Sequence, residues 1–64
     1  MNIKIWSTNR CPWCHKAKRL MTLKGMEYEE MQGFHPNHRT VPYIEIDGKP
    51  LGGFTDLVRY VRSM

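Results

Sequence analysis

The sequence predicts an α/β protein of two layers, with the element order β-α-β-loop-β-β-α. Alternating polarity at residues 2–6 is followed by a segment with helical spacing of apolar residues. A second alternating segment at residues 43–47 ends in Asp47-Gly48, a strong hairpin turn signal, and helical spacing then returns near the end of the chain. A helix joining two parallel strands, followed by a hairpin and a helix on the same face, forms two layers.

The first strand and helix have the clearest patterns. In residues 2–6, Ile3 and Ile5 are expected to face the core. The following helix begins near Pro12, where a proline loses no hydrogen bond, and runs to about residue 24. Gly25 is a suitable left-handed stop. The apolar side of this helix is expected to carry Cys14, Ala17, Leu20, Met21 and the stem of Lys24.

The second half of the chain predicts shorter elements. Met26 to Met31 is a weaker strand candidate because glutamates are poor strand formers, and residues 32–39 form a connecting loop. Lys49 to Leu51 is the short returning strand of the hairpin, with Pro50 suited to an edge. A final helix, capped by Thr55 or Asp56, is expected to carry the apolar positions Leu57, Val58, Tyr60, Val61 and Met64.

Composition predicts one soluble globular domain spanning residues 1–64, with 41% hydrophobic and 25% charged residues. The formal net charge of +4 favours anionic partners, but the basic residues lack interleaved aromatics. They therefore indicate a solvated helix face and no nucleic-acid partner. The chain shows no secretory leader and no apolar run long enough to span a bilayer, so we expect a cytoplasmic protein without a membrane partner.

Two cysteines separated by two residues, Cys11 and Cys14, indicate redox chemistry. So short a loop would stabilise the fold little as a structural disulfide. A thiolate is the form that attacks a disulfide, and the start of a helix favours negative charge on Cys11. Cys14, one turn further on and more buried, can then attack a mixed disulfide formed at Cys11.

Two further motifs indicate a peptide-like ligand with charged ends. In Thr40-Val41-Pro42, a cis proline would present the backbone of Val41 to such a ligand. A plain trans proline that opens a strand is the alternative. In Gly52-Gly53-Phe54-Thr55-Asp56, the N–H groups at a helix start can hold a carboxylate, and Asp56 can pair with an ammonium group. A plain turn before a helix cap is the alternative for this motif.

With these three motifs in this order, the chain resembles a glutaredoxin of the dithiol type over nearly its whole length, apart from the middle. The resemblance implies a minimal thioredoxin-like fold whose usual middle helix is missing or reduced to a loop. It also implies that Cys11 reduces glutathione mixed disulfides and protein disulfides, with glutathione as the co-substrate. No metal is required for this chemistry. A monomer is expected, with client proteins such as ribonucleotide reductase.

The resemblance also assigns a glutathione site. The backbone of Val41 would pair with the tripeptide, while Thr55 and Asp56 would hold its γ-glutamyl end. Thr8 stands where many relatives place a lysine for the glycyl carboxylate, so Arg10, His38 or Arg39 would have to replace it. The full set of expected glutathione-binding residues is Arg10, Trp13, Thr40, Val41, Pro42, Gly53, Phe54, Thr55 and Asp56.

The short middle segment leads to a structural expectation. Without a helix there, one sheet face should be open to solvent, because the strand at 43–47 alternates where strands covered on both faces read as continuous apolar runs. Lys4 and Glu45 are expected on this face, together with Trp6 and Phe34.

Four other functions remain as alternatives. The chain could be a redoxin linked to thioredoxin reductase, or it could carry a bridging iron–sulfur cluster as a minor activity. A small zinc module could use Cys11, Cys14, His35 and His38, although the two pairs are further apart than in a zinc finger. The string Cys11 to His15 also satisfies the C-x-x-C-H pattern of covalent haem attachment, which depends on an exported context.

Overall fold

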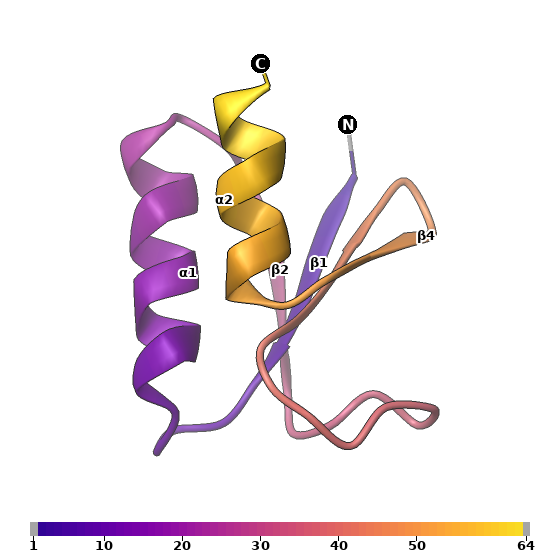
Figure 1. Ribbon diagram of the computed structural model, residues 1–64. Coiled ribbons are helices and arrows are strands. Elements are labelled where there is room, and N and C mark those ends of the chain that lie inside the picture. The colour runs from indigo at the N-terminus through magenta and orange to yellow at the C-terminus, as the bar shows by residue number, and fades with distance from the viewer. Residues whose placement is uncertain (1, 64) are drawn as a thin grey trace.

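The computed structural model describes residues 2–63 and confirms the predicted element order (Figure 1). The elements are β1 (Ile3–Ser7), α1 (Pro12–Leu23), β2 (Glu29–Gln32), β3 (Tyr43–Ile46), β4 (Lys49–Gly52) and α2 (Phe54–Arg62).

The sheet has four strands in the order β2-β1-β3-β4. Strand β1 pairs in parallel with β2 and antiparallel with β3, and β3 pairs antiparallel with β4. Both helices lie on one side of this sheet, next to each other (Figure 1). The sheet is therefore covered by helices on one face, as the right-handed β-α-β connection and the following hairpin predict.

The core lies between the sheet and the two helices. Alternation along β1 buries Ile3 and Ile5 as predicted, and helical spacing brings one side of each helix onto them. The buried cluster consists of Ile3, Ile5, Ala17, Met21, Ile44 and Leu57. Across residues 2–63, no helix combines the length and apolar character needed to cross a membrane.

Strand β2 is shorter than predicted and begins later. Before β2, helix α1 ends in a turn in which the Met26 N–H donates to the Met21 carbonyl oxygen at 2.9 Å. Gly25 has the predicted left-handed conformation there, at φ 69°. Pairing with β1 begins only where Lys4 faces Glu29. The glutamates are tolerated because β2 is an edge strand with exposed side chains.

The hairpin confirms its sequence signal. Asp47 and Gly48 both have positive φ, at 53° and 80°, as a two-residue type I′ turn requires. The returning strand β4 is at the sheet edge, where Pro50 was expected.

The sheet face away from the helices is less open than predicted. The described chain has no helix between β2 and β3, as expected, but the loop at residues 33–42 folds over one end of this face. His38 stacks on Tyr43 at 4.0 Å between ring centroids, and His35 contacts both Tyr43 and Trp6. Tyr43 is consequently buried. Of the other residues expected on an open face, Phe34 is exposed, whereas Lys4, Trp6 and Glu45 are half-buried.

The last helix begins two or three residues earlier than the predicted caps, Thr55 or Asp56, would place it. Gly53 is the N-cap of α2, and Asp56 sits in the first turn, where its carboxylate Oδ2 accepts the Gly53 N–H at 3.1 Å. Thr55 and Asp56 are therefore helical residues. Leu57 is fully buried as expected, whereas Met64 lies outside the described residues.

Candidate active site

Cys11 occupies the N-cap of α1. The N–H of Cys14 donates to its Sγ at 3.2 Å, and the N–H groups of Cys14 and His15 donate to its carbonyl oxygen. A cysteine sulfur thus takes the place that a serine or aspartate oxygen usually has at a helix start. The first turn contains no acidic residue. The Cys14 N–H donor and the helix macrodipole together favour negative charge on the Cys11 sulfur.

Cys14 is in a different environment, although both cysteines are free thiols. Its side chain is 0% exposed, against 9% for Cys11, which confirms that it is the more buried of the two. Burial, followed by the hydrogen bond toward Cys11, raises the pKa of Cys14 to about 11, while the Thr8 backbone and the Lys18 charge act in the opposite direction. Near neutral pH, Cys14 is therefore protonated.

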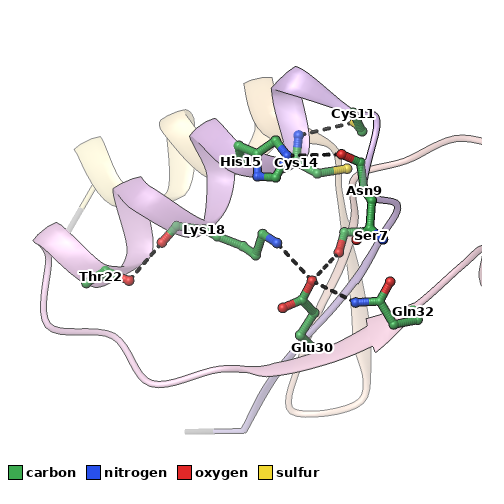
Figure 2. Close-up of polar contacts among 9 residues, drawn as sticks. All are labelled: Ser7, Asn9, Cys11, Cys14, His15, Lys18, Thr22, Glu30 and Gln32. Atoms are coloured by element: carbon green, nitrogen blue, oxygen red, sulfur yellow. Dashed lines mark hydrogen bonds and ion pairs between the residues drawn. The ribbon is translucent and has the colours of Figure 1, made fainter.

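A hydrogen-bond network centred on Glu30 connects helix α1 to the sheet (Figure 2). The Oε2 atom of Glu30 accepts hydrogen bonds from Lys18 Nζ at 2.8 Å, Ser7 Oγ at 2.8 Å and Gln32 Nε2 at 3.3 Å. The Glu30 carboxylate raises the pKa of Lys18, and Lys18 with Ser7 lowers the pKa of Glu30. The network ties α1 to β1 and β2 and holds the Lys18 ammonium one helical turn from Cys14.

Sequence reasoning missed this network. Ser7 follows the strand predicted at residues 2–6, but it ends β1 and is fully buried, which is tolerated because its hydroxyl donates to Glu30. The available signal was the spacing of Lys18, four residues after Cys14 and therefore on the same side of the helix.

A pocket of about 250 Å³ opens beside Cys11. It brings together three segments that are distant in sequence, namely the cysteine turn, the end of the long loop and the start of α2. The residues that line it are Trp13, Thr40, Val41, Pro42, Gly53, Phe54 and Thr55. All of these belong to the set expected from sequence.

The loop segment lies directly against the active sulfur. The Val41–Pro42 peptide bond is cis, as one reading of the sequence predicted. The Cys11 thiol donates to the Val41 carbonyl oxygen at 3.6 Å. Pro42 is buried behind this contact. The Val41 backbone is therefore placed where a ligand attached to Cys11 would run past it.

The glycine pair allows close packing at the other side of the pocket. Gly52 has φ 123°, and a Cβ atom there would collide with the Asp56 carboxylate. Asp56 does not line the pocket, but its carboxylate accepts the Gly53 N–H and so stabilises the turn that precedes α2.

Trp13 forms an aromatic wall of the pocket. Its ring is 53% exposed and lies 5.4 Å from the Phe54 ring between centroids. Lys16 Nζ lies 4.4 Å from the Trp13 ring centroid. The wall is thus held by a neighbour from each helix and still presents an open face.

The basic residue expected to replace the missing lysine is not fixed by this arrangement. Arg10 and Arg39 are exposed and do not line the pocket. His38 is engaged with Tyr43 on the other face of the sheet. Arg10 and Arg39 therefore remain the two candidates.

The structure does not bring together the four residues of the zinc alternative. His35 and His38 pack around Trp6 and Tyr43, across the sheet from the cysteines, and His35 Nε2 lies 3.3 Å from the Glu45 carboxylate. No group of three or more metal-ligating side chains forms in the part of the chain that the structure describes.

Comparison with known proteins gives matches over nearly the whole chain. The glutaredoxin family profile matches residues 3–32. Glutaredoxin 3 of Escherichia coli K12 is 33% identical over 67 residues, covering 88% of this chain and 81% of the relative.

Solved structures agree with this match. Glutaredoxin 1 of Francisella tularensis, solved as a complex with cacodylate, superposes with a TM-score of 0.85 and 25% identity, covering 97% of this chain and 93% of that one. A buckwheat glutaredoxin–glutathione complex has a TM-score of 0.82 at 23% identity, covering 95% of this chain and 68% of that one. The fold is therefore thioredoxin-like, in its glutaredoxin form.

Proposed function

Because the chain belongs to the glutaredoxin family, we propose that it is a glutathione-dependent thiol–disulfide oxidoreductase, with Cys11 attacking and Cys14 resolving. Thiol–disulfide exchange is the general chemistry of the family. One observation carries the more specific proposal: the sulfur at the helix start contacts the Val41 carbonyl oxygen, and Val41 lines a pocket together with Trp13 and the start of α2. The proposed clients are glutathionylated and disulfide-bearing proteins, ribonucleotide reductase among them.

The proposed reaction on a glutathione mixed disulfide uses Cys11 alone. Its thiolate attacks the glutathionyl sulfur, a new disulfide joins Cys11 to glutathione, and the client leaves as a thiolate that takes up a proton. A second glutathione thiolate then attacks the glutathionyl sulfur held on Cys11. Oxidised glutathione leaves, and the Cys11 thiolate is restored.

A disulfide within a client protein would need both cysteines. Cys11 attacks one client sulfur, and the Cys14 thiolate then attacks Cys11 Sγ, which closes the Cys11–Cys14 disulfide and releases the second client thiol. Two glutathione molecules reduce that disulfide. Once Cys11 is part of a mixed disulfide, its charge and its hydrogen bond no longer raise the pKa of Cys14. Burial, the largest cause of the raised pKa, remains, while the Thr8 backbone and Lys18 act against it and favour the Cys14 thiolate that this step needs.

The pocket residues have proposed roles toward glutathione. The Val41 backbone would pair with the peptide, Thr55 and the N–H groups at the start of α2 would hold the γ-glutamyl carboxylate, and Trp13 would cover the ligand. Arg10 or Arg39 would reach the glycyl carboxylate. The residues that line the pocket, and the start of α2 among them, support these roles.

The test compares one peptide carrying two different mixed disulfides, with glutathione or with 2-mercaptoethanol. The protein is expected to reduce the glutathionylated peptide faster, because glutathione has a peptide portion that can occupy the pocket and 2-mercaptoethanol does not. In Thr55→Ala, the KM for it should rise about fivefold, the effect of one lost hydrogen bond. Initial rates with excess glutathione measure both quantities.

Thr22→Ala is the matched control, since Thr22 is exposed on α1 and its hydroxyl donates to the Lys18 carbonyl oxygen outside the pocket. It should leave the KM unchanged. Equal rates on the two mixed disulfides, or equal effects of the two variants, would overturn the glutathione dependence.

A further inference from the structure

The charges of the protein are divided between its two layers. The helices and the Lys24 cap of α1 carry six of the ten Lys and Arg residues but only one of the six carboxylates. That carboxylate belongs to Asp56 and is used in the cap of α2. The basic residues of the helical layer are Lys16, Lys18, Arg19, Lys24, Arg59 and Arg62.

A groove of about 320 Å³ runs between the two helices. Its apolar floor is formed by half-buried side chains, and Lys24 and Arg62 stand exposed at its edge. Among the described residues, neither of these two cations is in an ion pair. The apolar residues of the floor are Leu20, Phe54, Val58 and Val61.

The groove and the pocket beside Cys11 share one lining residue, Phe54. Phe54 lines both of them, because it stands at the first position of α2, where the helix start meets Trp13. Figure 1 shows α1 and α2 side by side on one face of the sheet, and the residues that line the groove belong to these helices and to the Lys24 cap. A polypeptide whose disulfide reacts at Cys11 can therefore reach this groove past Phe54.

We propose that this groove docks the acidic segment of a client protein whose disulfide reacts at Cys11. The proposal rests on the proposed function and adds the class of client. An apolar client side chain would fill the floor, and client carboxylates would face Lys24 and Arg62.

A nucleic acid fits this surface less well than an acidic polypeptide does. The floor between the cations is aliphatic apart from Phe54 and offers no donor to phosphates or base edges. Single-strand binding would also need aromatic side chains on which successive bases stack.

The length of the groove sets the design of a test peptide. From Phe54 to Arg62 the helix rises about 12 Å, which an extended peptide covers in about four residues. The probe is a peptide whose cysteine is glutathionylated. Two residues from this cysteine it carries a four-residue segment, an isoleucine followed by three glutamates. The comparison peptide has glutamines in place of the glutamates.

The wild-type protein is expected to reduce the acidic peptide with a kcat/KM about fivefold above that of the neutral one, the size of a partly screened surface charge effect. Arg62→Glu should remove this preference without changing the rate on the neutral peptide. Lys49→Glu makes the same charge change at an exposed site in β4 and should retain the preference.

Equal rates on both peptides in the wild type, or equal effects of the two variants, would overturn the proposed docking. Binding of a single-stranded DNA oligonucleotide that is tighter than that of the acidic peptide and sensitive to Arg62→Glu would also overturn it. Absence of activity on both peptides would instead be a failure of the proposed function, so the two failures are distinguishable.

Discussion

Replacing Cys11 by serine is expected to abolish turnover of every disulfide substrate, with a loss of about a hundredfold or more. A serine hydroxyl at the N-cap would keep the helix start, since serine is a good cap residue, but it cannot form a disulfide. Stability should therefore remain close to that of the wild type while the activity disappears. Thermal unfolding measured beside the activity separates the two effects.

Cys14→Ser is the matched variant because it makes the same change one helical turn away. It should keep activity on a glutathionylated peptide, whose reduction uses only Cys11. Activity on an intramolecular protein disulfide should fall about tenfold, because the mixed disulfide with the client can no longer be resolved from within. An equal loss on both substrates would contradict the roles assigned to the two sulfurs.

Leu57→Ala is expected to destabilise the protein by about 3 kcal/mol. Leu57 is fully buried and is the only α2 residue in the buried cluster, among the residues that the structure describes. A domain of 64 residues has a free energy of unfolding of about 3 to 10 kcal/mol, so much of its stability would be lost. Urea unfolding followed by circular dichroism measures the change.

Leu23→Ala is the control for the same substitution. Leu23 is 72% exposed on α1, and its removal should cost less than about 0.5 kcal/mol. Similar losses in the two variants would show that α2 is not held by the core contacts described above.

The helix that carries the cysteines, the first strand and the hairpin turn could be predicted because local sequence signals determine them. Pro12 marks the helix start, Gly25 its end, and Asp47-Gly48 a turn whose two residues both need positive φ. Alternation in β1 correctly gave the buried side chains. These features depend on backbone preferences and spacing, which a single sequence contains.

The remaining features depend on contacts between distant segments. Nothing local to Ser7 indicates that Glu30, across the parallel pair of strands, will accept its hydroxyl and let it be buried. Tyr43 alternates like a solvent-facing residue, yet the histidines of the long loop cover it. The residues that line the pocket could be predicted better, since all of them lie in the three motifs, but the positions of Arg10 and Asp56 outside its lining could not.

Site-resolved alkylation tests most directly whether Cys11 is the attacking sulfur and Cys14 the protected one. The reduced protein is treated with limiting iodoacetamide between about pH 6 and pH 8, and mass spectrometry of the peptides locates the label. With its pKa at about 11, only about one Cys14 in a thousand is ionised at pH 8, and its sulfur is buried as well. We expect the label on Cys11 throughout this range. Labelling of Cys14 as fast as Cys11 would contradict the account.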